Sequence, residues 1–226
     1  MNHVSLISPV KMLAGVVEAR AIIIDKKNGE LDERLARLLE NRKSGTGGQA
    51  EAFRLASRDM LRNGSYKPTG RAKPASEYLL RAAQEGHFPR INTAVDINNY
   101  ISLNYMVPIS LWDIDKAGGR PLTLDLGQAG EKYVFNESGQ EIDLKDLVCG
   151  VLTDDGSSRK PVINPVKDSM FTKTDAASQN VGYLVYYPAS AGSRDHLMHI
   201  LDELAELLGG ITEEPVNRGI AESTEK

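Results

Sequence analysis

The hydrophobic residues of this chain recur with two different periods, one typical of helices and the other of strands. Leucines at positions 31, 35, 38 and 39 repeat every three to four residues, as on the buried side of an amphipathic helix. Similar stripes follow further along the chain, and Ser76 and Ser193 are suited to cap two of them. The predicted helices cover residues 30–42, 49–63, 77–84 and 193–208.

Short runs of β-branched and other apolar residues, bounded by turn residues, predict strands. Between them, residues 95–108 are expected to be helical or irregular. Helices are expected mainly before Ile91 and after Ser193, with strands between them, and this order indicates an α+β domain. The predicted strands cover residues 16–24, 122–126, 132–135, 148–153 and 181–187.

The composition is that of an ordinary globular domain, since hydrophobic residues make up 41% of the chain and charged residues 26%. No run approaches the roughly 18 apolar residues that a spanning helix needs, so no membrane association is expected. Cys149 is the single cysteine, which rules out a disulfide within the chain. The first 14 residues lack the pattern of a secretory signal. Together these observations predict a cytoplasmic protein.

Positive charge is concentrated in one part of the chain. The net charge is −4, yet residues 42–90 hold ten basic and four acidic residues, so the remainder is strongly acidic. Arg54, Arg58 and Arg62 stand four apart and would share one face of a helix, and a basic loop over residues 67–74 follows them. Such a patch can guide RNA to one place, although a charge run can equally be a solvated helix face.

Several familiar chemistries have no motif in this sequence. There is no Gly-x-Ser-x-Gly elbow, no His-Glu-x-x-His helix and no Gly-x-Gly-x-x-Gly loop. His196 and His199 stand three apart on a predicted helix and are expected to be structural, while Cys149 is expected to be a buried, inert thiol. A triad hydrolase, a zinc enzyme and a nucleotide-binding ligase are therefore not expected, and no metal or cofactor is predicted.

One stretch, residues 87–119, carries a more specific pattern. It contains, in this order, Asn92, Val95-Asp96, Asn99-Tyr100, Pro108 and Trp112-Asp113-Ile114-Asp115-Lys116. This pattern resembles the signature of the editing domain of bacterial phenylalanyl-tRNA synthetase β subunits. Flanking similarity at residues 71–81 and at Gly130-Glu131 extends the resemblance to about residues 67–188. It implies an α+β fold, a single domain over residues 1–210 with a β-sandwich-like core flanked by helices. Residues 211–226 are expected to form a disordered tail.

The resemblance implies hydrolysis of mischarged tRNA, with a pocket near the positions matched by Asn98, Asn99, Pro108 and Ser110. Amides donate and accept hydrogen bonds, and a proline stiffens the pocket wall. An aminoacyl ester is already reactive, so orienting it and one water can suffice without a covalent nucleophile. Asp96 is expected to hold a backbone turn.

These expectations assign three sets of residues. Catalytic roles are expected for Asn98, Asn99 and Ser110. The substrate pocket is expected to comprise Asn92, Pro108 and Tyr186. RNA contacts are expected from Arg54, Arg58, Arg62, Lys67, Arg71, Lys73, Arg81 and Arg90.

The sequence departs from that family at positions that matter. Ser110 stands where synthetase-linked members usually carry His. Residues 182–188 offer tyrosines where those members carry a Glu that reads a tyrosyl hydroxyl, so specificity for tyrosyl-tRNA is not expected. No ATP-handling motif is present, so the chain is not expected to charge tRNA.

Three functions follow. The first is a trans-acting aminoacyl-tRNA deacylase that binds the aminoacylated 3′ end of a tRNA. The second is a non-catalytic tRNA- or RNA-binding module that has kept the scaffold without the hydrolase activity. The third is a binder of a free amino acid or related small molecule. DNA binding is not expected, because most of the chain is acidic.

Overall fold

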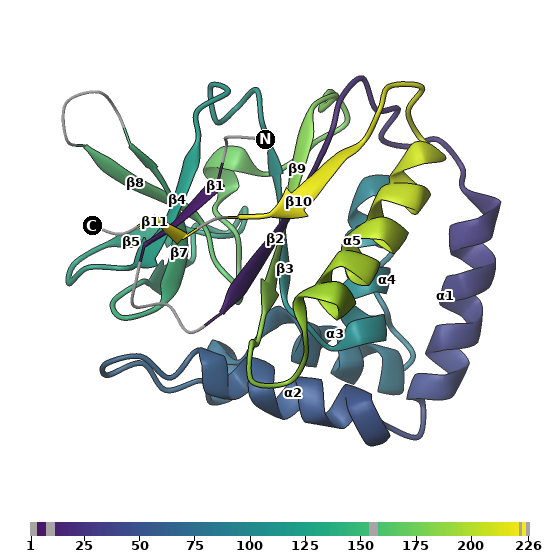
Figure 1. Cartoon of the computed structure of the whole chain (residues 1–226), viewed down its shortest axis with the longest axis horizontal. Helices are drawn as coiled ribbons and strands as arrows, with labels where there is room; N and C mark the ends of the chain where they lie inside the picture. The colour runs from purple at the N-terminus through teal and green to yellow at the C-terminus, as the bar shows by residue number, and fades with distance from the viewer. Residues whose placement is uncertain (1–3, 8–11, 154–157, 222, 225–226) are drawn as a thin grey trace.

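The computed structural model describes residues 4–7, 12–153, 158–221 and 223–224, and these form three layers (Figure 1). Helices cover one face of a four-stranded sheet, and a five-stranded sheet packs on the opposite face. Within these ranges, no helix combines the length and apolar character needed to cross a bilayer. The helices are α1 (Gly29–Arg42), α2 (Gly48–Met60), α3 (Ala75–Gln84), α4 (Thr93–Tyr105) and α5 (Arg194–Gly209), with 3-10 turns η1 (Gly70–Ala72) and η2 (Met170–Thr172).

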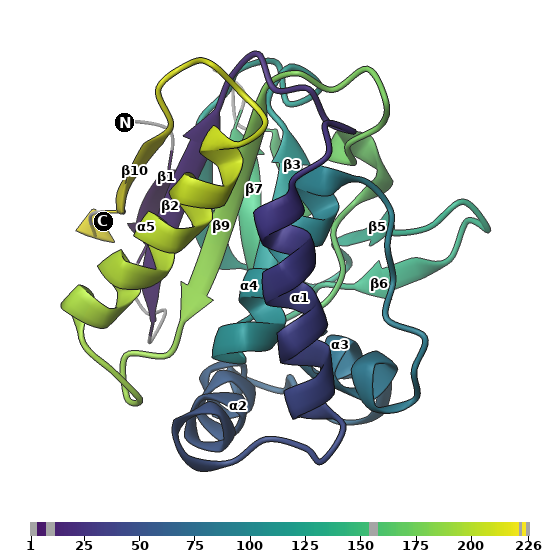
Figure 2. The same cartoon turned by 90° about the vertical axis from the view of Figure 1, so that its right-hand side faces the viewer.

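The four-stranded sheet has the order β10-β2-β9-β3 and is antiparallel throughout. The five-stranded sheet has the order β11-β1-β4-β7-β8, in which β1 runs parallel to both of its neighbours. A separate hairpin, β5–β6, projects from the body (Figure 2). The strands are β1 (Val4–Ile7), β2 (Leu13–Ala19), β3 (Ile109–Asp113), β4 (Leu122–Leu126), β5 (Lys132–Val134), β6 (Glu141–Asp143), β7 (Val148–Thr153), β8 (Arg159–Ile163), β9 (Val181–Tyr187), β10 (Asn217–Ile220) and β11 (Ser223–Thr224).

Strand β9 separates two hydrophobic cores and is buried along its whole length. Successive side chains of a strand point to opposite faces. Tyr183 and Val185 therefore enter the core beneath the helices, whereas Leu184 and Tyr186 enter a second core between the two sheets. The predicted α+β fold with a β-sandwich core is confirmed by this arrangement.

The four predicted helices are present, each within three residues of its predicted ends. The cap of α3 is a correction: Pro74 occupies the cap position and Ser76 lies inside the helix, with its hydroxyl buried and unpartnered among the described residues. The fixed backbone of proline suits the entry to a helix and replaces the expected serine. Helix α4 occupies most of the stretch expected to be helical or irregular, whereas β3 follows that stretch at a place where no strand was predicted.

The strand predicted over residues 16–24 is also corrected, because β2 ends at Ala19. Ala21 has φ 48°, which turns the chain out of the sheet. Ile22 and Ile24 are nevertheless buried, and they reach the helical core from a loop. Two of the three isoleucines are thus buried without strand pairing, while Ile23 between them is 61% exposed.

The prediction of a disordered tail is wrong for the described part of residues 211–226. Ile211 is fully buried, and Asn217–Ile220 pairs with β2 as an edge strand. Pairing uses backbone N–H and C=O groups, so polar side chains do not prevent it. Residues 222, 225 and 226 lie outside the described residues.

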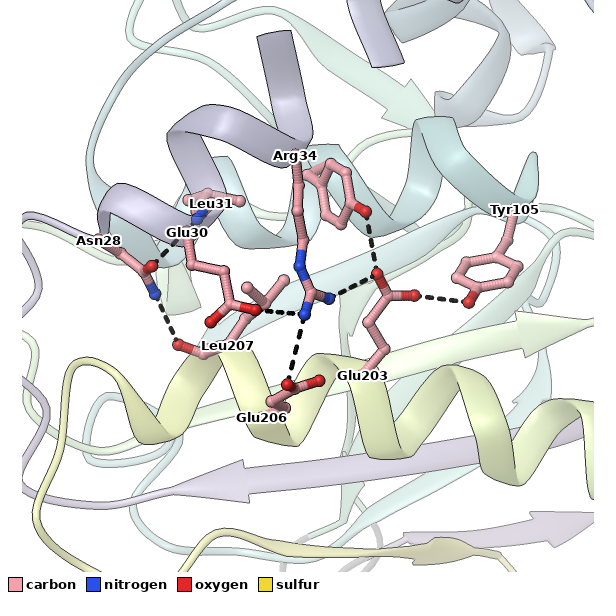
Figure 3. A network of polar contacts seen from close by, with 9 residues as sticks. Asn28, Glu30, Leu31, Arg34, Tyr105, Glu203, Glu206 and Leu207 are labelled. Carbon is pink, nitrogen blue, oxygen red and sulfur yellow. Dashed lines mark hydrogen bonds and ion pairs between the residues drawn. The ribbon is translucent and has the colours of Figure 1, made fainter. Parts of the chain in front are cut away.

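A polar network joins α1, α4 and α5 (Figure 3). Arg34 donates to Glu203 at 3.0 Å, and the hydroxyls of Tyr100 and Tyr105 donate to the same carboxylate at 2.9 and 2.5 Å. The side chain of Glu203 is 12% exposed, so its charge depends on these donors for solvation. Burial raises the pKa of both tyrosines, which keeps them protonated as donors.

We predict that Glu203→Ala lowers the free energy of unfolding by about 2–3 kcal/mol, because the hydroxyls of Tyr100 and Tyr105 lose their acceptor and Arg34 loses one of its carboxylate partners. Chemical denaturation followed by circular dichroism measures this change. Glu206→Ala is the matched control, since Glu206 is 58% exposed and contacts the same Arg34 at 3.3 Å. The control should cost less than about 1 kcal/mol. Equal effects of the two variants would contradict the prediction.

Candidate functional site

The N-terminus of α4 is held by the side chains that the sequence pattern singled out there. Asn92 caps the helix, accepting a hydrogen bond from the backbone N–H of Val95 at 2.9 Å. Asp96 accepts from the backbone N–H of Ile91 at 2.9 Å and pairs with Arg90 at 2.6 Å. The structural role predicted for Asp96 is confirmed, and Asn92 serves the same helix end.

The two amides predicted to be catalytic lie one after the other on α4. The Nδ2 group of Asn98 donates to Oδ1 of Asn99 at 3.3 Å. The Oδ1 atom of Asn98 is buried with no partner among the described residues, and Asn99 is 8% exposed. Helix α4 packs on the face of β3 that carries Ile109 and Leu111.

Ser110 lies on the opposite face of β3, turned toward the five-stranded sheet. It is fully buried, and its register partner is Leu184 of β9. Its hydroxyl donates to Oδ1 of Asp168 at 2.6 Å and lies 3.0 Å from the hydroxyl of Tyr186. The carbonyl oxygen of Asn164 is a further acceptor at 3.1 Å. The tyrosine O–H is thus free to donate to the serine oxygen.

Asp168 is the ionisable member of this group, and sequence reasoning missed it. It lies in the loop after β8 and accepts from the backbone N–H groups of Asn164 and Leu111 at 3.2 and 3.3 Å. Burial raises the pKa of its carboxyl to about 7, despite the hydrogen bond from Ser110. The only sequence signal was a pair of polar residues in a turn, which is too common to mark a site.

The predicted site is therefore divided by β3. Pro108, Ser110 and Tyr186 lie together, with the carbonyl of Pro108 accepting from the backbone N–H of Tyr186 at 3.1 Å. Among the described residues, no hydrogen bond joins Asn98 or Asn99 to this group. The polar cluster of Ser110, Asp168 and Tyr186 is termed the serine cluster below.

Tyrosine and asparagine side chains extend the serine cluster. Asn164 donates through Nδ2 to the hydroxyl of Tyr133, and that hydroxyl donates to the carbonyl of Lys167 at 2.7 Å. Burial raises the pKa of Tyr133 and Tyr186 well above the usual range. Both phenols therefore stay protonated at neutral pH, and Asp168 is the member that changes charge there.

The three arginines spaced four apart, Arg54 and Arg58 on α2 and Arg62 just after it, are paired with carboxylates. Arg54 contacts Glu51 at 2.5 Å and Glu77 at 3.2 Å, and Arg58 also binds Glu77. The hydrogen bond from Arg54 lowers the pKa of Glu51 to about 2, so this carboxylate stays charged. Arg62 pairs with Asp59 at 3.2 Å. These partners reduce the charge that the three arginines offer to phosphates.

The remaining basic residues fall into two groups. Arg81 pairs with Glu85 at 2.7 Å, and Arg90 pairs with Asp32 as well as Asp96. Lys67, Arg71 and Lys73 have no carboxylate within ion-pair distance in the part of the chain that the structure describes. Of the residues predicted to contact RNA, those without an ion pair among the described residues thus lie between α2 and α3.

The histidines of α5 and the cysteine have structural surroundings. His196 lies 2.9 Å from the hydroxyl of Tyr187, its ring packs on Phe53, and burial lowers its pKa. Cys149 is fully buried, which raises the pKa of its thiol. Across the described ranges, His, Cys, Asp and Glu side chains form no group of three suited to a metal ion.

Comparison with known proteins identifies the family to which this chain belongs. The family model of the B3/4 domain matches residues 67–198, which is more than half of the chain, and the chain belongs to that family. The resemblance predicted over residues 67–188 is thereby confirmed. The phenylalanine–tRNA ligase β subunit of Streptococcus mutans serotype c (strain ATCC 700610 / UA159) is 33% identical over 112 residues. That match covers 48% of this chain and 13% of the ligase subunit.

A solved structure of an N-terminal fragment of the phenylalanyl-tRNA synthetase β subunit from Pyrococcus horikoshii is also similar. It aligns with a TM-score of 0.45 and 14% identity, covering 99% of this chain and 52% of the fragment. The chain therefore spans a small part of the curated relative and about half of the solved fragment.

Proposed function

We propose that this chain is a trans-acting aminoacyl-tRNA deacylase, a cytoplasmic hydrolase whose reaction centre is the serine cluster. The observation that carries the proposal is the 2.6 Å hydrogen bond from Ser110 to Asp168, whose carboxyl has a pKa of about 7. A carboxyl that titrates near neutral pH is suited to act as a general base. Ser110 also occupies the position that the editing-domain pattern assigns to the pocket.

The proposed reaction needs no covalent intermediate. The carboxylate of Asp168 takes a proton from a water molecule, whose oxygen attacks the ester carbonyl. The ester C–O bond then breaks, and the proton passes to the departing ribose oxygen. The products are a free amino acid and an uncharged tRNA end. Asp168 as a whole residue is partly exposed, whereas Ser110 and Tyr186 are fully buried.

The remaining cluster members orient the base. Ser110 and two backbone N–H groups hold the carboxylate in one position. Tyr186 stays protonated and supplies a hydrogen bond to Ser110. Such preorganisation adds to the intrinsic reactivity of an aminoacyl ester. Asn98 and Asn99 lie across β3, so their catalytic role is not part of this proposal.

The purified chain is expected to release the amino acid from at least one member of a full panel of correctly charged and mischarged tRNAs. The rate should exceed spontaneous hydrolysis by at least about 100-fold, the usual contribution of general-base catalysis. Loss of radiolabelled amino acid from precipitable tRNA measures it. Spontaneous rates across the whole panel would end the proposal.

A second function, RNA binding without turnover, is favoured by a different observation. Ser110 and Tyr186 are both fully buried, and the serine hydroxyl already has neighbours at 2.6, 3.0 and 3.1 Å. A network so enclosed can serve the fold alone. In that case Ser110→Ala alters stability and leaves salt-sensitive tRNA binding unchanged.

A further inference from the structure

An open pocket of about 660 Å³ lies between three segments of the chain. These segments are the loop after α2, the β5–β6 hairpin and the loop that follows β8. Its basic and aromatic lining residues, termed the basic pocket below, are Tyr66, Lys67, Arg71, Phe135, Lys145 and Lys167. The volume lies within the range of sites for small ligands.

The cations of the basic pocket are not neutralised by the protein. Lys67, Arg71, Lys145 and Lys167 have no carboxylate within ion-pair distance among the described residues. The two acidic residues of the lining, Glu141 and Asp143, form no ion pair with the cations of the basic pocket among the described residues. Glu141 pairs with Lys132 at 2.8 Å, and Asp143 accepts from the backbone N–H of Lys145 at 2.8 Å. The pocket therefore contrasts with the paired arginines of α2.

Two features prepare the basic pocket for an anion. Lys167 lies over the ring of Phe135, with Nζ 3.9 Å from the ring centroid, which fixes the direction of its ammonium group. Its pKa is lowered by burial and, secondly, by the positive charge of Arg71. An anion between Lys167 and Arg71 would relieve that repulsion, and the energy gained would favour binding.

A third feature is the aromatic wall. Tyr66 is fixed by a hydrogen bond from its hydroxyl to the carbonyl of Ala72 at 3.0 Å. Phe135 is half-buried on the facing hairpin. Aromatic rings beside cations are the combination on which nucleotides stack while their phosphates are held. Carboxylate oxygens such as those of Glu141 and Asp143 in the lining can accept hydrogen bonds from ribose hydroxyls.

We propose that the basic pocket binds the phosphate of a nucleotide, with its base and ribose against Tyr66 and Phe135. Two sources share this chemistry, a free mononucleotide and a phosphodiester near the 3′ end of RNA. The preference for the RNA end rests on the proposed function, because a deacylase must hold the nucleotides that carry the ester.

Fluorescence anisotropy with the full chain tests the pocket, using a 5′-labelled CCA trinucleotide as probe. Unlabelled CCA, AMP and inorganic phosphate serve as competitors. Arg71→Ala and Lys167→Ala should each weaken trinucleotide binding about 10-fold and reduce the salt dependence by about one unit of slope. Arg37→Ala, which removes one exposed charge on α1, is the matched control and should bind like the wild type. Thermal melts establish that each variant is folded.

The competitors distinguish a free mononucleotide from the 3′ end of RNA as the ligand. Competition by CCA well below the concentration of AMP supports the RNA end, and equal competition supports a free mononucleotide. Failure of the wild type to bind any probe at low salt overturns the inference, as does binding that Arg71→Ala and Lys167→Ala leave unchanged. Trinucleotide binding without any deacylation would contradict the proposed function and support the basic pocket. Deacylation without trinucleotide binding would support the proposed function and contradict the basic pocket.

Discussion

Asp168→Asn is expected to lower the rate of aminoacyl-ester hydrolysis by at least about 100-fold. An amide cannot accept the proton that the proposed mechanism takes from water. Its Oδ1 atom can still accept from Ser110 and the backbone of Asn164, so the loop keeps its two hydrogen bonds at that position. The weaker contact to Leu111, 3.3 Å long, is the one lost. Single-turnover deacylation of the most reactive tRNA in the panel measures the effect.

The controls separate chemistry from folding. Asp25→Asn removes an exposed carboxylate in a loop and should retain the wild-type rate. Ser110→Ala should act more mildly than Asp168→Asn, because it removes an orienting group and leaves the base. If Asp168→Asn deacylates at the wild-type rate while folded, Asp168 is not the base.

The same carboxyl makes both rate and stability depend on pH. The catalysed rate should rise as pH increases through about 7, where Asp168 loses its proton, and then level off. The free energy of unfolding should fall over the same rise in pH. The folded pKa of about 7 lies above the ordinary value of 3.8, so the folded state binds the proton more tightly than the unfolded state does.

The stabilisation that comes from the proton is present below about pH 4 and is lost as pH rises to about 7. Between about pH 5 and about pH 8, the wild type should lose on the order of 2 kcal/mol relative to Asp168→Asn. Urea denaturation of both proteins at the two pH values measures this difference. Parallel curves for the two proteins would show that the carboxyl has an ordinary pKa.

Gly182→Ala is expected to destabilise the fold by about 3 kcal/mol, which lowers the melting temperature by about 6–12 °C. Gly182 lies in β9 opposite Trp112 of β3. A methyl group there would approach the Trp112 ring to 2.2 Å, and this ring is 2% exposed between the two sheets. The ring is large and enclosed, so it cannot move aside without disturbing both sheets.

Gly209→Ala is the matched control for this substitution. Gly209 ends α5, and a methyl group there meets nothing within 4 Å. Its melting temperature should equal or slightly exceed that of the wild type, since alanine favours helix. Differential scanning calorimetry compares the three proteins. An unchanged melting temperature for Gly182→Ala would show that the strands can separate to admit the methyl group.

Local sequence patterns determined α1, α2, α3 and α5 and several strands, but they left α4 undecided. Leucine stripes and end signals such as Ser193 act over a few residues, so helix positions could be predicted to within about three residues. The ordered signature around Asn92, Asn99 and Pro108 identified the family, and the role of Asp96 at the turn before α4 followed from its neighbours.

Only the tertiary structure decided which of these residues meet. Ser110 and Asp168 are 58 positions apart, and no local pattern links a serine in a strand to an aspartate in a distant loop. The period of two along β3 turned Ser110 away from the amides of α4, although all three belong to one sequence signature. Glu77 pairs with Arg58, 19 positions away, and also with Arg54, whereas the cations of the basic pocket, which three segments assemble, form no ion pair among the described residues. Long-range packing fixes which side chains are in contact and which are buried. These two properties set the charge and the pKa of the groups proposed to act in the reaction.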